Sequence, residues 1–128
     1  MKFLLDTHTF IWVDENPAML SARATAAIQD KKNILLLSYA SVWELQIKLR
    51  LGKLTFSTPL AQKIQDQQQK NGLELLSIEL PHIFGLDQLP THHRDPFDRL
   101  LIAQAIIEGL PILSHDSLFA HYPVRVVW

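Results

Sequence analysis

The sequence predicts an α/β protein, with short buried strands of a mainly parallel sheet alternating with helices. Apolar runs recur along the chain, at Phe3–Leu5, Ile34–Leu37 and Ile112–Leu113. They lack the polar alternation of a strand that has one face in water, so we expect both faces of the sheet to be covered. The segments between them carry residues typical of helix starts and ends, as in repeated βαβ units. The order of the strands does not follow from this pattern.

The first strand is expected at Lys2–Leu5, followed by a short helix over Thr9–Asp14 that the turn-forming pair Asn16-Pro17 ends. The next helix is expected to begin after Ser21, because its hydroxyl suits an N-cap. It runs through an alanine-rich stretch to about Lys31. Together these segments lead the chain back toward a second strand.

The second strand is predicted at Ile34–Leu37, and the segment after it is ambiguous. Glu44–Leu51 alternates polar and apolar residues, which by periodicity is typical of an exposed strand. Its residues are mostly good helix formers, however. Ser41 and Glu44 have the spacing of a capping box, and Gly52 suits the position after a helix. Helix is favoured, and strand remains the alternative.

The second half repeats the alternation of helices and strands. A helix over Pro59–Asn71 has Gly72 just past its end, and a helix over Pro96–Glu108 is followed by Gly109. The other expected elements are a helix over Pro81–Leu89 and the strands Glu74–Ile78, Pro111–Leu113 and Val124–Val127.

Composition limits the classes of protein. We expect a single domain over residues 1–128, since this length suits one core. There is no cysteine, which excludes disulfides and thiolate metal sites and is compatible with the cytoplasm, where we expect the protein to act. No secretory signal and no apolar run of roughly 18 residues is present, so no membrane association is expected. The net charge is −1, so a nucleic acid would have to meet a local basic patch.

Four acidic residues are predicted to meet at one edge of the sheet. Asp6 directly follows the first strand, and Asp116 closely follows the fourth. Glu44 comes soon after the second strand, and Asp98 lies in the first turn of the helix that leads into the fourth. Ligands of open parallel sheets gather outside the carboxyl ends of the strands. A right-handed crossover starts its helix at that same end, so all four carboxylates can converge there.

Each acid also has a purely structural interpretation. Asp6 could open a turn or cap the next helix, and Asp116 could cap a helix that starts at Ser117. Glu44 could complete a capping box with Ser41 or pair with Lys48 one turn later. Taken one at a time, these interpretations are the more common ones.

Asp98 is harder to explain as a simple helix-start residue. Asp95 suits the N-cap of its helix and Pro96 the first position. Asp98 shares the face of Leu101, Ile102 and Ala105, while Gln104 and Glu108 are expected on the polar side. A buried carboxylate must be paired or coordinate a cation. Arg94 or Arg99 could pair with it, although Arg99 points about 100° away around the helix.

The chemistry that fits these carboxylates is binding of a divalent cation, since they would otherwise repel one another. Oxygen ligands suit Mg²⁺ or Mn²⁺, which can orient a phosphodiester and activate water. No phosphate-binding glycine loop and no G-x-S-x-G serine motif is present, which favours hydrolysis of a polymer backbone. Zinc bound by His92 and His93 is disfavoured because adjacent side chains diverge, and His8 is expected to support the site at most.

Several stretches resemble the PIN domain, the small metal-dependent nuclease fold of VapC-type toxins. The matching stretches are Leu5-Asp6-Thr7-His8 with Trp12, Ser41-Val42-Trp43-Glu44 leading to Lys48–Lys53, His92–Ala105, Ser114-His115-Asp116 and the closing Val126-Val127-Trp128. The likeness runs nearly end to end, and the stretch around Asp98 is the most specific.

The resemblance implies an α/β/α sandwich around a mainly parallel sheet, and it favours helix for the segment after Glu44. It implies that Asp6, Glu44, Asp98 and Asp116 form the catalytic and metal-binding site for Mg²⁺ or Mn²⁺. It also implies an endoribonuclease that cleaves single-stranded RNA as the toxin of a toxin–antitoxin pair. The implied partners are the RNA substrate, a cognate antitoxin protein and a second copy of the chain.

Two other functions stay open at the level of the sequence. The chain could be a non-catalytic module that binds RNA or protein and whose acids serve as caps, or a nuclease acting on DNA or on structured RNA. Phosphate contacts are expected from basic residues, namely Lys48, Arg50, Lys53, Arg94 and Arg99.

Overall fold

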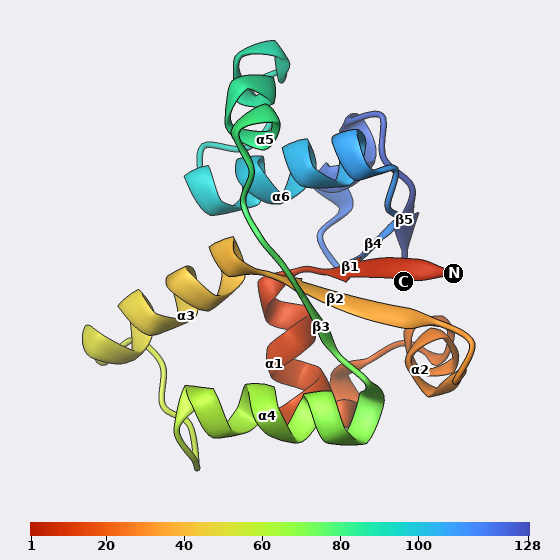
Figure 1. The fold of residues 1–128 in the computed structure, drawn as a ribbon, viewed down its shortest axis with the longest axis vertical. Helices are drawn as coiled ribbons and strands as arrows, with labels where there is room; N and C mark the ends of the chain where they lie inside the picture. Colours follow the sequence, from red (N-terminus) through yellow and green to blue (C-terminus); the bar gives the residue numbers. More distant parts are fainter.

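The structure, a computed structural model, describes residues 1–128 and has a five-stranded sheet at its centre (Figure 1). The strands lie in the order β3-β2-β1-β4-β5, and every neighbouring pair is parallel. Their bounds are β1 (Lys2–Leu5), β2 (Ile34–Ser38), β3 (Glu74–Leu76), β4 (Ile112–Leu113) and β5 (Val126–Val127). The predicted α/β class with a parallel sheet is therefore confirmed, and β3 is shorter than expected.

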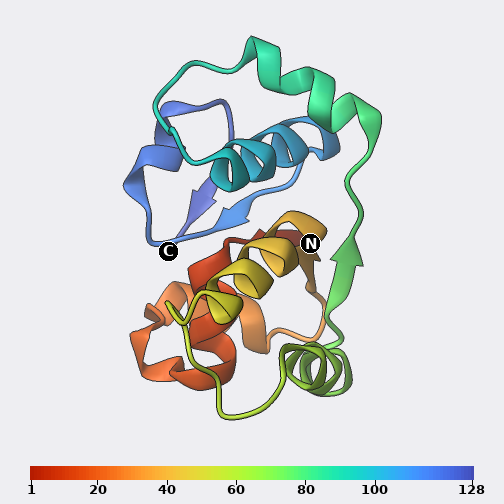
Figure 2. The same cartoon turned by 90° about the vertical axis from the view of Figure 1, so that its left-hand side faces the viewer.

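Helices cover both faces of this sheet, giving three layers (Figures 1 and 2). Apolar side chains of β1 alternate between the two faces, as the two-residue period of a strand requires. Phe3 and Leu5 pack with one core, and Leu4 packs with the other. The first core is closed by α1 (Thr7–Glu15), α2 (Ala22–Gln29) and α4 (Leu60–Asn71), and the second by α6 (Pro96–Glu108) and a 3₁₀ turn over Ser117–His121.

Two helices lie beside these layers. Helix α3 (Tyr39–Arg50) starts directly at the carboxyl end of β2 and inserts Leu45 into the first core. Helix α5 (Leu80–Phe84) packs against α6 on its outer side (Figure 1). Short 3₁₀ turns complete the chain at Pro17–Met19 and Gly85–Gln88. None of these helices combines the length and the apolar character that crossing a membrane requires.

The segment around Glu44 is helical, which confirms the favoured interpretation, but the predicted capping box is wrong. Helix α3 begins at Tyr39, and its N-cap is Ser38, whose hydroxyl accepts a hydrogen bond from the Ala40 amide at 3.0 Å. Ser41 is inside the helix and fully buried. Because the helix starts one turn earlier than expected, Glu44 lies in its second turn rather than in its first.

Gln104 does not lie on the polar side of α6 that the sequence pattern predicted for it. The residue is completely buried, whereas Ile106 and Ile107 on the same helix are exposed. Its side-chain oxygen accepts from the Ser38 hydroxyl at 2.5 Å, and its amide nitrogen donates to the Ser77 carbonyl at 3.2 Å. Burial is tolerated because both ends of the amide find partners. Glu108, by contrast, is exposed as expected.

Helix α4 is fastened to α1 by a buried lysine. The Lys63 ammonium lies 2.7 Å from Asp14 and 2.6 Å from Glu15, and its side chain is only 4% exposed. Burial alone would lower the pKa of Lys63, but the hydrogen bonds to Asp14 and Glu15 outweigh it and raise that pKa. The charged form is therefore the stable one in the folded chain.

Candidate metal centre

The carboxyl ends of β1 and β4 lie side by side at the point where the order of strand addition reverses. The chain runs from β1 outward to β2 and β3, and later to β4 and β5 on the other side of β1. The crevice outside the carboxyl ends at such a reversal is the usual ligand site of open parallel sheets. Asp6 directly follows β1, and Ser114 and Asp116 follow β4.

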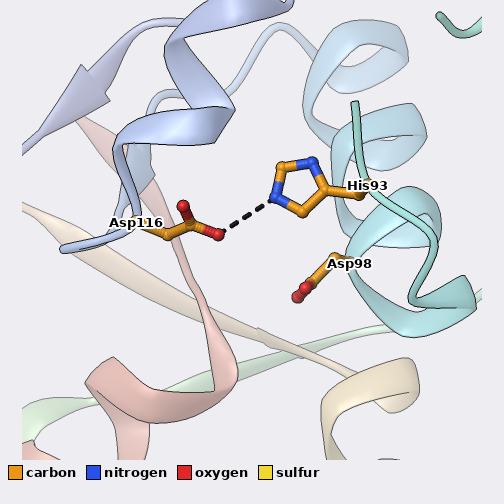
Figure 3. Close-up of side chains that lie close together, drawn as sticks. All are labelled: His93, Asp98 and Asp116. Carbon is orange, nitrogen blue, oxygen red and sulfur yellow. Dashed lines mark hydrogen bonds and ion pairs between the residues drawn. The ribbon is translucent and has the colours of Figure 1, made fainter. Parts of the chain in front are cut away.

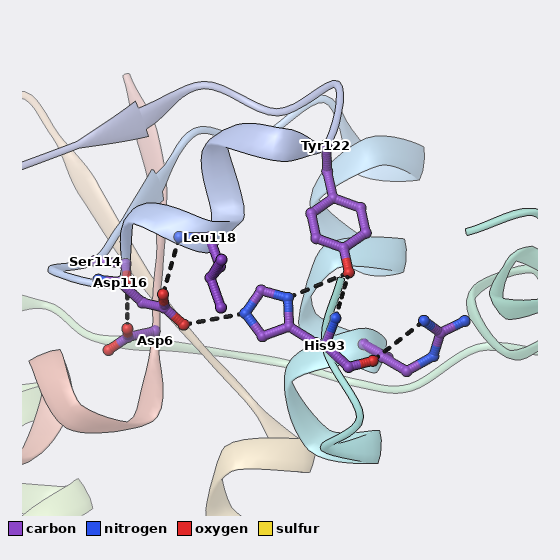
Figure 4. Close-up of polar contacts among 7 residues, drawn as sticks. Asp6, His93, Ser114, Asp116, Leu118 and Tyr122 are labelled. Carbon is purple, nitrogen blue, oxygen red and sulfur yellow. Dashed lines mark hydrogen bonds and ion pairs between the residues drawn. The ribbon is translucent and has the colours of Figure 1, made fainter. Parts of the chain in front are cut away.

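Asp6 is the N-cap of α1, and its carboxylate is fixed from two sides. One oxygen accepts a hydrogen bond from the Thr9 amide at 2.7 Å. The other accepts one from the Ser114 hydroxyl, which in turn accepts the Asp116 amide at 2.9 Å (Figure 4). Asp6 is only 6% exposed. The capping role is thus real, and it coexists with a position at the crevice.

Glu44 reaches the same edge from the second turn of α3. Its Oε1 accepts a hydrogen bond from the Thr7 hydroxyl at 2.8 Å, and its Oε2 lies 2.7 Å from the Lys48 ammonium. Thr7 has one hydroxyl proton, which goes to Glu44, so the Ser41 hydroxyl 3.0 Å away must donate to Thr7. The predicted pairing with Lys48 is present, yet the glutamate is buried at 4% exposure.

Asp116 is held by His93, which the sequence suggested only as a disfavoured zinc ligand. His93 Nε2 lies 3.0 Å from Asp116 Oδ2, and the Leu118 amide donates to Oδ1 at 2.9 Å (Figure 4). Burial raises the pKa of Asp116, but the hydrogen bonds from His93 and Leu118 outweigh it, so the net pKa lies below the usual range. The carboxylate is therefore held in its charged form.

The contacts of His93 indicate which of its ring nitrogens carries a proton. The Tyr122 hydroxyl accepts the His93 backbone amide at 2.9 Å and lies 3.2 Å from His93 Nδ1. A hydroxyl that accepts the amide can still donate its own proton to Nδ1, which leaves Nε2–H to donate to Asp116. The ring stacks on Phe119 at 4.9 Å and is buried. His93 is thus oriented as a donor to Asp116.

Asp98 differs from the other three acids because no side chain or amide donates a hydrogen bond to its carboxylate. It is half-buried, and its pKa is raised to about 7, chiefly by burial and then by the charges of Asp95, Glu44 and Asp6, against a lowering effect of His93. Neither of the expected arginine partners reaches it. The Arg99 guanidinium donates instead to the carbonyls of Pro90, His93 and Leu86.

Asp98 and Asp116 point into a shared space beside His93 (Figure 3). Each of the three offers a ligand atom, and these atoms lie within 4.8 Å of one another. Asp6 and Glu44 stand outside this tight group but near enough for their charges to raise the Asp98 pKa. The structure thus gathers all four predicted acids at one edge, with Asp98 and Asp116 in one tight group with His93.

Other residues of the matched stretches have structural roles. Asp95 is the N-cap of α6 and accepts the Phe97 amide at 2.8 Å, as expected. His92 stands apart from the acids, with its ring 5.1 Å from those of His121 and Tyr122. His8 is exposed at the rim of the crevice.

A hollow opens on each side of the acids. One, of about 260 Å³, is lined by Asp6, His8, Trp12, His115 and Asp116. The other, of about 420 Å³, lies between α3 and the start of α6, with Glu44 in its wall. A larger apolar hollow of about 720 Å³ lies elsewhere, between α5 and α6, away from these carboxylates.

The donor set fits a hard divalent cation such as Mg²⁺ or Mn²⁺. The ligand atoms available are carboxylate oxygens and a ring nitrogen of His93, with no thiolate, and Asp98 is the carboxyl that accepts no hydrogen bond. A hydrogen-bonded carboxylate oxygen retains a second lone pair, so Asp6, Glu44 and Asp116 remain able to coordinate a cation. The cation would also remove the repulsion that raises the Asp98 pKa.

Comparison with known proteins points to one family. A stretch of 57 residues is 42% identical to Ribonuclease VapC16 of Mycobacterium tuberculosis (strain ATCC 25618 / H37Rv), and it spans 44% of this chain but only 40% of that curated relative. The fold is similar to the crystal structure of VapBC2 from Rickettsia felis bound to a promoter DNA fragment, with a TM-score of 0.75, 17% identity and coverage of 98% and 97% of the two chains. It is also similar to DNA-bound VapBC from Salmonella typhimurium, with a TM-score of 0.68, 18% identity and coverage of 98% and 96%.

The strands, the helices and all four acids therefore lie within a fold shared with these proteins. The family model of the PIN domain matches residues 3–124, and the chain belongs to the PIN domain family.

Proposed function

We propose that this protein is a metal-dependent endoribonuclease that cleaves single-stranded RNA and acts as the toxin of a toxin–antitoxin pair. The observation that carries the proposal is the half-buried carboxyl of Asp98. It accepts no hydrogen bond, and its pKa is raised to about 7 by burial and by other carboxylates. Such a group is poorly explained as a stabilising contact, but it is well explained as a ligand for a cation.

In this proposal Asp6, Glu44, Asp98 and Asp116 hold Mg²⁺ or Mn²⁺. When bound, such an ion lowers the pKa of water and stabilises charge on phosphate oxygens. The surrounding residues orient the carboxylates: Ser114 and the Thr9 amide fix Asp6, Thr7 and Lys48 fix Glu44, and His93 fixes Asp116.

Similarity to named proteins supports the RNA substrate and the partners. The relative with 42% identity is named a ribonuclease, and solved structures of similar fold are VapBC complexes. We therefore propose that a cognate antitoxin binds this chain, that two copies of the chain associate, and that the protein acts in the cytoplasm as a single domain over residues 1–128. The matched part of the curated relative is less than half its length, so these statements rest on the likeness and on the site together.

The test is cleavage of a mixed pool of single-stranded RNA with Mg²⁺, Mn²⁺ or EDTA. Wild type is expected to cut only with a metal, and Asp6→Asn and Asp98→Asn are expected to be inactive while retaining their circular dichroism spectra. A single-stranded DNA pool and a duplex RNA serve as parallel substrates. Cleavage of DNA but not of RNA would refute the proposal. Cleavage of RNA by the two variants at the wild-type rate would also refute it.

Absence of cleavage by wild type would favour a binding module whose acids are caps. Thermal stability with Mn²⁺ then distinguishes the two cases. A bound ion raises the melting temperature by mass action, whereas a capping acid gives no response to the metal.

A further inference from the structure

The hollow of about 420 Å³ beside Glu44 combines positive charge with aromatic surface. Its lining includes Lys53 from the turn after α3 and Arg94 from the loop before α6. Both side chains belong to exposed residues, and neither takes part in an ion pair or a side-chain hydrogen bond. Lys48, in the same wall, is already paired with Glu44. Lys53 and Arg94 are therefore unpaired cations, although the carboxylates of Glu44 and Asp95 also line the hollow.

An exposed indole contacts Phe97, one of the residues that line the same hollow. Trp43 directly precedes Glu44 in α3 and is 60% exposed. Its ring meets the ring of Phe97, which lines the hollow, edge-on at a centroid distance of 5.2 Å and an interplanar angle of 83°. This contact fixes the position of the indole, while most of its surface remains in contact with water.

An anion and a flat apolar group are the chemistry that such a site would recognise, and a nucleotide supplies both. Cationic side chains bind the phosphate of single-stranded nucleic acids, and aromatic side chains stack on the bases without regard to sequence. In a duplex the bases are already stacked and paired, so they are not available to an exposed indole. The position next to Glu44 would put such a nucleotide beside the carboxylates.

We propose that this hollow is a subsite for one nucleotide of single-stranded RNA next to the cleaved phosphodiester. Lys53 and Arg94 bind the flanking phosphate, and Trp43 stacks on the adjacent base. The inference rests on the proposed function, because it takes RNA as the substrate. It adds a physical reason for a preference for single strands and assigns that preference to Trp43.

The test measures RNA binding without cleavage. Asp98→Asn protein in EDTA is titrated into a fluorescein-labelled single-stranded RNA of mixed sequence, followed by anisotropy. Adding Trp43→Ala is expected to weaken binding about tenfold, and Trp43→Phe to retain most of the affinity. Lys53→Ala and Arg94→Ala are each expected to lower the slope of log affinity against log salt by about 0.7. A duplex of the same sequence is expected to bind equally to the Trp43 variants and to their parent.

Matched control variants remove exposed groups far from the hollow. Arg23→Ala removes an exposed cation on α2, and Phe84→Ala removes an aromatic residue on α5 that is 66% exposed. Neither is expected to change RNA affinity or its salt dependence. The parent and the Trp43 variants are also run on a sizing column, because a second copy of the chain could cover the same indole.

Each outcome is decisive. Loss of affinity confined to the Trp43, Lys53 and Arg94 variants supports the subsite. If the parent binds RNA and all these variants bind equally well, the subsite is refuted while the proposed function stands. If Trp43→Ala separates a dimer and leaves RNA affinity unchanged, the indole is a contact between copies and the inference is overturned. If the parent binds no RNA at all, the subsite is overturned, and the cleavage assay with wild type and a metal decides the proposed function separately.

Discussion

Replacement of Asp98 by asparagine should stabilise the metal-free protein. The folded chain raises the pKa of Asp98 from 3.8 to about 7, chiefly through burial and repulsion from neighbouring carboxylates. A shift of about 3 units corresponds to about 4 kcal/mol at 1.36 kcal/mol per unit. Because the residue is only half-buried, screening by solvent reduces the expected effect to about 2 kcal/mol. Asparagine keeps the shape of the protonated acid and avoids this cost.

The pH dependence follows from the direction of the shift. The unfolded chain releases the Asp98 proton near pH 3.8, and the folded chain holds it until about pH 7. The free energy of unfolding therefore falls progressively as the pH rises between these values. Above pH 7 the full destabilisation by the ionised Asp98 is present. The stability difference between Asp98→Asn and wild type should be near zero at pH 3.5 and largest at pH 8.

Urea unfolding in EDTA, repeated from pH 3.5 to 8, measures this difference. Asp87→Asn, which removes an exposed carboxylate on the Gly85–Gln88 turn, serves as the control and should change stability little at any pH. With millimolar Mn²⁺ the order should reverse, because only wild type gains stability from the bound ion. If Asp98→Asn is no more stable than wild type at pH 8 in EDTA, the ionised Asp98 carboxylate does not destabilise the folded chain, and the reasoning fails.

Three further substitutions test the supporting contacts. His93→Leu should weaken Mn²⁺ binding measured by calorimetry, because it removes the hydrogen bond to Asp116. His93→Gln should bind Mn²⁺ more tightly than His93→Leu, because its amide can donate to Asp116. Equal Mn²⁺ affinity in both variants would contradict this role. Lys63→Met should lower the free energy of unfolding by about 3 kcal/mol, since two carboxylates lose their partner, and unchanged urea midpoints would argue against it. Gln104→Leu should cost about 2 kcal/mol in the same assay, because it strands a buried hydroxyl and a carbonyl, whereas Gln46→Leu at an exposed site on α3 should cost little.

The fold could be predicted because its central strands correspond to short apolar runs in the sequence. Phe3–Leu5, Leu35–Leu37 and Ile112–Leu113 are buried in the sheet, and glycines end α4 and α6 in the left-handed conformation. The start of α3 could not be placed from local signals, since Ser38 and Ser41 are equally good capping residues. The choice depends on where β2 ends.

The gathering of the four acids could also be predicted, because topology alone puts strand ends and the start of α6 at one edge. The supporting contacts could not be. In the sequence His93 cannot be told from its neighbour His92, because only the folded loop directs the His93 ring toward Asp116. Gln104 has the sequence context of a surface residue, and its partner Ser38 is brought to it only by the fold. Both depend on partners far away in the sequence, which no local pattern reports.

The most direct test of the central claim, that four carboxylates from separate segments form one cation site, is a titration of free Mn²⁺ followed by electron paramagnetic resonance. We expect wild type to remove Mn²⁺ from solution with saturable binding. We expect Asp6→Asn, Glu44→Gln, Asp98→Asn and Asp116→Asn each to weaken that binding strongly without loss of folded structure. Binding that is absent in wild type, or that is unchanged in Asp98→Asn, would contradict the account.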